Sequence, residues 1–174
     1  MRGIFLTLAV TMFAIPISVH ADVEIVFEEG SPNDYMTIRN KDLCELGPVS
    51  VTIDLSTSAG GLYFDTTASG AGVSEYQPFR IYTGGDRVRS VTNVSDGGTI
   101  VTLSLTHLGP AESVGFTIDL DDSGRSGPTT IEGGEILGAT AALKFDLAGD
   151  DVPPTVARFG TDGRAVISAS TCLS

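Results

Sequence analysis

The chain has 174 residues, of which 41% are hydrophobic and 18% are charged. This length suits one domain, and an ordinary apolar content with few charges excludes a disordered chain and a coiled coil. Ten basic residues stand against 22 acidic ones, which gives a formal net charge of -12. Such a chain repels nucleic acid phosphates and anionic lipid headgroups, so we expect no nucleic acid partner, whereas cationic partners such as divalent metal ions are compatible with it.

The first 21 residues have the pattern of a secretory signal peptide. A positive charge at Arg2 precedes an apolar run over residues 4–17, and the small residue Ala21 marks the cleavage site. The run is shorter than the ~20 residues that span a bilayer, so we expect cleavage and no membrane insertion afterwards. The sequence therefore predicts a signal peptide, residues 1–21, and one secreted or periplasmic domain, residues 22–174. Cleavage removes Arg2 and no acidic residue, which lowers the net charge from -12 to -13.

Apolar residues of the mature part recur with a period of two, which predicts strands with one buried face and one wet face. The clearest alternation covers residues 49–55, 99–106, 112–120 and 142–147. Further strands are expected at residues 23–27, 35–39, 61–65, 78–83, 87–94, 129–132, 136–141, 154–159 and 164–170.

Glycine-containing turns separate these segments at short intervals, and no stretch of ten or more mature residues has a helical period. The clearest hairpin signal is the turn at 160–163, which lies between the segments TVARF and RAVISAS. Residues 66–74 and 121–134 are expected to form long loops. The pattern predicts an all-β fold, a two-sheet antiparallel β-sandwich that is either immunoglobulin-like or a jelly roll.

Two cysteines remain after the predicted cleavage, Cys44 and Cys172. In an oxidising compartment a disulfide between them is expected, and it would join the last strand to an early one. Closing so long a loop would stabilise the fold by about 5 kcal/mol in the chain-entropy model. The alternative is two separately buried thiols.

The densest acidic cluster is the segment FTIDLDDSG at residues 116–124. The alternation turns Asp119 and Asp121 to the solvent face of a strand, and Asp122 begins the following loop. Carboxylates this close repel one another unless a cation lies between them, and Ca²⁺ binds six to eight oxygens. The expected ligands are Asp119, Asp121 and Asp122, with Glu132 or Glu135 from the next segment. The alternative is a solvated acidic turn that Arg125 partly neutralises.

The sequence offers little for catalysis. The mature part has one histidine, His107, and it contains no nucleophile elbow, no HExxH pair, no CxxC pair and no phosphate-binding loop. We therefore expect a non-catalytic protein. A hydrolase built around His107 or around a pair of carboxylates is the third hypothesis.

A carbohydrate-binding module is the second hypothesis, because Tyr63, Tyr76 and Tyr82 supply aromatic rings in one region of the sequence. Aromatic rings with a polar tip suit a partly wet binding surface. The chain has no tryptophan, which weakens such a platform.

The order of several phrases resembles a family of small exported bacterial proteins named aggregation factor core. The phrases are VEIVFEEGSPNDYMTIRN, VSVTIDLSTSAGGLYFD, GAGVSEYQPF, FTIDLDDSG, EILGATAAL and FGTDGRAVISAS, and together they cover nearly the whole mature part. The family is similar in name to a sponge adhesion proteoglycan whose cell contacts depend on calcium. The resemblance implies a role in adhesion or aggregation, with this chain itself or cell-surface components as partners. It also implies a calcium ion, for which Asp119, Asp121 and Asp122 are the natural place.

Overall fold

The computed structural model describes residues 21–30, 33–72, 76–92, 94–124, 131, 133–146 and 152–169. The predicted signal peptide up to residue 20 lies outside these ranges, as does most of the strand expected at 129–132. Nowhere in these ranges is there a helix with the length and hydrophobicity needed to cross a membrane. One short 3₁₀ turn, η1 (Gly85–Arg87), accompanies the strands.

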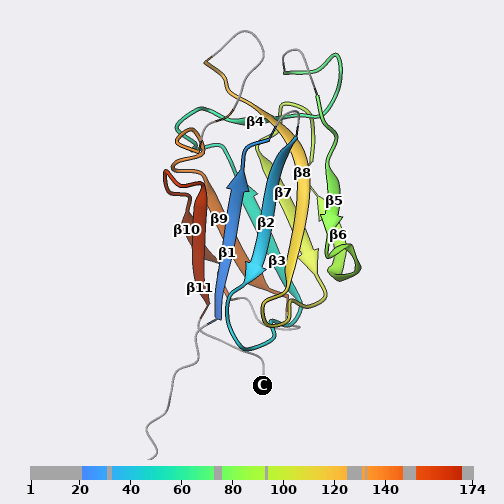
Figure 1. Ribbon diagram of the computed structural model, residues 1–174, viewed down its shortest axis with the longest axis vertical. Coiled ribbons are helices and arrows are strands. Elements are labelled where there is room, and N and C mark those ends of the chain that lie inside the picture. The colour runs from blue at the N-terminus through green and yellow to red at the C-terminus, as the bar shows by residue number, and fades with distance from the viewer. Residues whose placement is uncertain are drawn as a thin grey trace, which may run out of the picture.

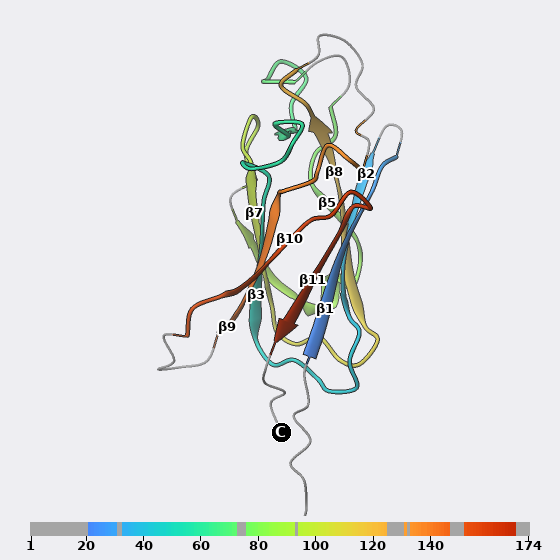
Figure 2. The same cartoon turned by 90° about the vertical axis from the view of Figure 1, so that its left-hand side faces the viewer.

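The strands form two antiparallel sheets that pack face to face, so the expected all-β sandwich is confirmed (Figures 1 and 2). The first sheet has the order β11-β1-β2-β8-β4, and β5 also pairs with β8. The second sheet has the order β10-β9-β3-β7-β6. The bounds of the first sheet are β1 (Ala21–Glu28), β2 (Asp34–Asn40), β4 (Tyr63–Asp65), β5 (Arg80–Thr83), β8 (Ser113–Asp121) and β11 (Arg164–Ala169). Those of the second are β3 (Val49–Asp54), β6 (Val88–Thr92), β7 (Ile100–Leu105), β9 (Thr140–Phe145) and β10 (Thr155–Arg158).

The core lies between the sheets and follows the period-two pattern. In β3 the side chains of Val49, Val51 and Ile53 are fully buried, while the residues between them stay partly exposed. In β8 Phe116 and Ile118 point inward from the opposite sheet. Each such side chain contributes about 1.5–3 kcal/mol when it is buried, so the alternation is enough to fix which face of each strand points inward.

Two local expectations are wrong. Residues 136–139 form turns instead of a strand, and β9 begins only at Thr140. The turn at 160–163 does not close a hairpin, because β10 pairs with β9 in the second sheet and β11 pairs with β1 in the first. The turn therefore carries the chain from one sheet to the other, along the edge where β10 and β11 lie close together (Figure 2).

β8 is central to the arrangement, since it pairs with β2 along one side and with β5 and then β4 along the other. It ends at the end of the sandwich where β4 lies, uppermost in Figure 1. We call this the aspartate end, and it contains Asp34, Asp65, Asp96, Asp121 and Asp122. We call the other end the paired end, and it contains Asn40, Arg87, Leu108 and Glu112.

Candidate functional site

The short strand β4 brings a further aspartate beside the predicted acidic cluster. Tyr63 lies opposite Asp121 and Asp65 lies opposite Asp119 in the β4–β8 ladder. Their neighbours Phe64 and Leu120 point into the core, so these four residues share the outward side of the sheet. The expectation that Asp119 and Asp121 share one face is therefore confirmed.

The exposure expected for Asp121 is wrong, because its exposed fraction is only 3% whereas Asp119 is half-buried. The cover is the loop that follows β4. A Cβ atom on Gly72 would overlap the carboxylates of both Asp65 and Asp121, so the glycine backbone lies directly against the two side chains. Only a residue without a side chain allows this close approach.

Asp96 fastens the same loop. Its Oδ1 accepts hydrogen bonds from the backbone N–H groups of Thr66 at 2.9 Å and Thr67 at 3.1 Å, and its Oδ2 accepts one from Ala71 at 2.6 Å. Hydrogen bonds from backbone N–H groups stabilise the carboxylate and hold the pKa of Asp96 below its usual value. Asp96 thus remains charged and keeps the loop folded over Asp65 and Asp121.

Asp65 is buried and only partly hydrogen-bonded. Its exposed fraction is 3%, and its Oδ1 atom has no hydrogen-bond partner among the described residues. Burial raises the pKa of Asp65, and the neighbouring charges of Asp121 and Asp96 raise it further. A buried carboxylate in such surroundings has to be neutralised by a proton or by a cation.

Two further buried aspartates complete the aspartate end. Asp34 accepts hydrogen bonds from the backbone N–H of Gly30 at 3.3 Å and of Leu120 at 3.1 Å. Burial nevertheless raises its pKa to about 7. Asp122 accepts a hydrogen bond from the Gly124 N–H at 2.7 Å and forms the turn after β8. Glu132 and Arg125 lie outside the described residues, as does the rest of the loop at 125–130.

The carboxylates of Asp65 and Asp121 form the centre of the candidate site. Within the described ranges, no group of three or more His, Cys, Asp or Glu side chains is already in position to hold a metal ion. Glu135, one of the expected ligands, also lies at the aspartate end. Its backbone carbonyl accepts a hydrogen bond from Gly60 N–H at 2.9 Å. The sequence pattern did not predict Asp65 as a site residue. The one feature that could have indicated it is its position at the end of the phrase GLYFD, just before a glycine-rich loop.

The tyrosines expected to form a glycan platform do not all come together, because Tyr82 lies far from Tyr63. Tyr63 lines a pocket of about 540 Å³ at the aspartate end, and its hydroxyl donates a hydrogen bond to the Ala71 carbonyl at 3.3 Å. Burial, followed by the charges of Asp121 and Asp65, raises the pKa of Tyr63. Tyr82 lies over Gly115 of β8. Tyr63 lies opposite Asp121, which is six residues farther along β8 and therefore about 20 Å from Gly115 at the rise of a strand.

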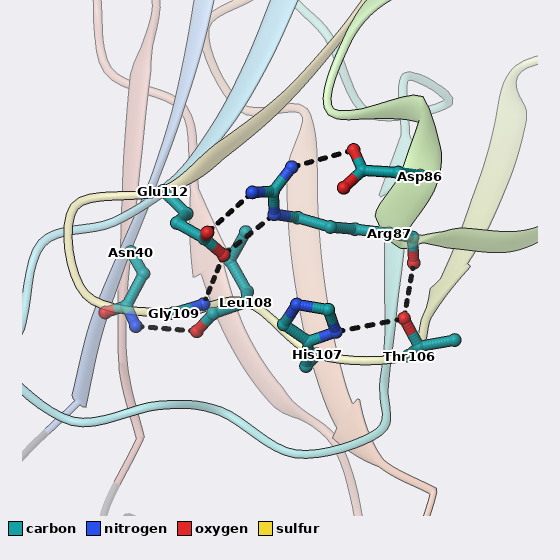
Figure 3. Close-up of polar contacts among 8 residues, drawn as sticks. All are labelled: Asn40, Asp86, Arg87, Thr106, His107, Leu108, Gly109 and Glu112. Carbon is teal, nitrogen blue, oxygen red and sulfur yellow. Dashed lines mark hydrogen bonds and ion pairs between the residues drawn. The ribbon is translucent and has the colours of Figure 1, made fainter.

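Hydrogen bonds and ion pairs connect the polar groups of the paired end that Figure 3 draws. Arg87 donates two hydrogen bonds to the Glu112 carboxylate, one of them from Nε at 2.7 Å. The same carboxylate accepts a hydrogen bond from Gly109 N–H at 2.9 Å. These donors, Arg87 first, lower the pKa of Glu112 to about 2.

His107 lies beside this ion pair, with its Nδ1 atom 3.1 Å from the Thr106 hydroxyl (Figure 3). The nearby carboxylate of Glu112 is already bound by Arg87. The geometry of these residues thus adds no acid–base pair to the hydrolase hypothesis.

Cys44 follows β2 at the paired end, where it packs against the core. Cys172 lies outside the described residues, so the disulfide stays a prediction that thiol titration of the denatured, unreduced chain would check.

Comparison of the chain with protein-family models, with curated proteins and with solved structures finds no match. The resemblance to aggregation factor core proteins therefore stays a prediction.

Proposed function

We propose that the chain is an exported, non-catalytic β-sandwich that acts in adhesion or self-association and binds a divalent cation, Ca²⁺, at its aspartate end. The observation that best supports a bound cation is the burial of the Asp65 carboxyl group. Its Oδ1 atom lacks a hydrogen bond within the described ranges, and the Asp121 carboxylate lies against the same glycine backbone. Hard cations such as Ca²⁺ take carboxylate oxygens as ligands.

Charge compensation supports this proposal. Burying a carboxylate whose oxygens are not all hydrogen-bonded costs free energy, and two adjacent carboxylates add repulsion. A bound Ca²⁺ removes both penalties. Asp65 and Asp121 would supply the charged ligands, and backbone carbonyls and water would complete the six to eight oxygens. Asp96 then acts as a positioning residue, because it holds the covering loop in place.

Two features support a role in association between molecules. The mature part carries a predicted net charge of -13, so divalent cations reduce the repulsion between copies or between a copy and an acidic surface. The edge formed by β10 and β11 exposes Val156 and Val166, whose exposed fractions are 55% and 51%. Exposed strand edges with apolar side chains are templates for pairing.

The cation is tested by calorimetric titration of the purified mature chain with CaCl₂. We expect one site with a dissociation constant on the order of 10⁻⁴ to 10⁻³ M, the range of extracellular calcium modules. Asp65→Asn should abolish the heat, whereas Asp86→Asn should leave it unchanged, because Asp86 is an exposed acid at the paired end. The proposed Ca²⁺ site is contradicted if the wild type gives no heat of binding, or if Asp65→Asn gives the same heat as the wild type.

Association is tested separately by sedimentation velocity in CaCl₂ and in EDTA. We expect a shift toward larger species in Ca²⁺, and a smaller shift after Val156→Lys, which places a charge on the exposed edge. A monomer under both conditions contradicts self-association while leaving the titration result intact.

A further inference from the structure

The outward face of the first sheet carries an aromatic pair that the cation site does not involve. Tyr82 of β5 and Tyr35 of β2 have exposed fractions of 50% and 37%. Their ring centroids are 5.6 Å apart and the ring planes meet at 78°, an edge-to-face contact. Two large rings that remain this accessible on a sheet face are a feature of binding surfaces.

Tyr82 is held in place by its neighbours on two other strands. Thr37 of β2 lies opposite Gly115 of β8, which in turn lies opposite Thr83 of β5. A Cβ atom on Gly115 would overlap the phenol end of the Tyr82 ring, so the glycine provides the space in which the ring lies. The Tyr82 hydroxyl reaches across β8 to within 2.7 Å of the Thr37 hydroxyl. A ring fixed in this way loses little side-chain entropy when a ligand stacks on it.

A shallow polar groove of about 220 Å³ continues from this pair across β2, β1 and β11. Thr37 belongs to both features, because it bonds Tyr82 and also lines the groove. The other lining residues are Glu24, Val26, Glu28, Arg39 and Arg164. Arg164 Nη1 donates to Glu24 Oε1 at 3.0 Å, so part of the groove is preorganised. Two carboxylates and two guanidinium groups provide both acceptors and donors with balanced charge.

We propose that this surface, formed by Tyr35, Tyr82, Thr37 and the groove residues, binds a neutral oligosaccharide. A pyranose ring has an apolar C–H face that stacks on an aromatic ring. Its hydroxyl groups both donate to carboxylates and accept from guanidinium groups. The two glutamates and the chain's net charge of -12 disfavour a phosphorylated or acidic ligand. We call this surface the Tyr82 platform. Along β8 it lies about 13 Å (Thr117, opposite Tyr35) to about 20 Å (Gly115, beneath Tyr82) from Asp121, so it goes beyond the proposed cation site.

The experiment screens the mature chain against an array of neutral oligosaccharides of glucose, mannose, galactose and N-acetylglucosamine, in EDTA so that a cation plays no part. The strongest oligosaccharide is then titrated by calorimetry. Tyr82→Ala should weaken its binding by about tenfold or more, since the stacking ring is lost. Tyr82→Phe keeps the ring and should stay within about threefold of the wild type. The matched control is Tyr76→Ala, which removes an exposed tyrosine that precedes Gln77 at the aspartate end.

Thermal unfolding of each variant confirms that it is folded. If Tyr82→Ala is unfolded, Arg39→Ala in the groove takes its place, with an expected loss of about fivefold. An array without binding overturns the proposal. Equal affinity of Tyr82→Ala and the wild type overturns it too, as does a loss confined to Tyr76→Ala.

Discussion

At the paired end, the fully buried side-chain amide of Asn40 donates hydrogen bonds to the Cys44 carbonyl at 2.7 Å and the Leu108 carbonyl at 2.9 Å. Its carbonyl oxygen accepts one from Asp42 N–H at 3.0 Å. At the aspartate end, Asp65 is almost as deeply buried, but one of its oxygens has no hydrogen bond among the described residues. The buried Asn40 amide is thus fully hydrogen-bonded at one end of the molecule, whereas the buried Asp65 carboxyl group is only partly hydrogen-bonded at the other.

This contrast indicates different roles for the two ends. Buried polar groups in folded proteins are nearly always hydrogen-bonded, and exceptions concentrate where a ligand supplies the missing partner. The Asn40 side chain needs no ligand, because protein groups already supply its hydrogen bonds. These bonds connect β2 to the turn before β8. Burial and the neighbouring charges raise the pKa of Asp65, so this carboxylate gains stability when a proton or a cation arrives.

The largest expected effect comes from removing the Asn40 amide. Asn40→Ala removes the donor to the Cys44 carbonyl and the acceptor of the Asp42 N–H, while the Leu108 carbonyl keeps its hydrogen bond from Leu46 N–H. The free energy of unfolding should therefore fall by about 3 kcal/mol, at ~1–3 kcal/mol for each buried group that loses its hydrogen bond. Urea unfolding measures it, and exposed Asp86→Ala at the same end should cost less than about 0.5 kcal/mol. A cost for Asn40→Ala near that of the control would mean that the paired end does not depend on this network.

The second effect is a pH dependence of the aspartate end in EDTA. The folded state holds a proton on Asp34 up to a pKa of about 7, whereas the unfolded chain releases it near 3.8. The folded state therefore binds more protons between these values, and stability should fall as the pH rises from about 4 to about 7, by on the order of 2 kcal/mol. Urea unfolding across this interval measures the slope. Asp34→Asn should flatten it, and a stability that rises instead would contradict the raised pKa.

The smallest effect has the opposite sign and belongs to the paired end. The pKa of Glu112 is lowered to about 2 from a usual 4.5. The contribution of Glu112 to the free energy of unfolding is therefore complete above about pH 4.5 and is lost as the pH falls toward 2. Glu112→Gln should make the acid limb of the stability profile shallower, with a modest change because the pair with Arg87 is partly exposed. Glu45→Gln, an exposed change after Cys44, serves as the control. Identical acid limbs for Glu112→Gln and the wild type would show that the ion pair contributes nothing measurable.

Local patterns were enough to predict the strands but not their long-range contacts. The alternation of residues 49–55 and 112–120 decides which side chains are buried, so two packed sheets follow from it. The turn at 160–163 looks like a hairpin because a tight turn is a local property. Whether its flanking strands join one sheet or two depends on β1 and β9, which pair with them from distant parts of the chain.

The same limit applies to the two candidate sites. Asp119 and Asp121 could be predicted because they lie two residues apart in one strand. Asp65 could not, since its approach to Asp121 depends on the register of β4 against β8 and on the loop that folds over both. Tyr35 and Tyr82 come into contact because their strands, β2 and β5, both pair with β8, and because Gly115 of β8 leaves space for the Tyr82 ring to lie across it.

The most direct test of the cation at the aspartate end is thermal unfolding of the mature chain in about 10 mM CaCl₂ and in EDTA, a Ca²⁺ concentration chosen to exceed the dissociation constants of extracellular sites. The wild type should melt about 5 °C higher in Ca²⁺, because the ion binds the folded state alone. Asp65→Asn should lose this difference and melt in EDTA at or above the wild type, since the amide relieves repulsion with Asp121. Equal melting of the wild type in Ca²⁺ and EDTA, or a full Ca²⁺ response in Asp65→Asn, would contradict the site.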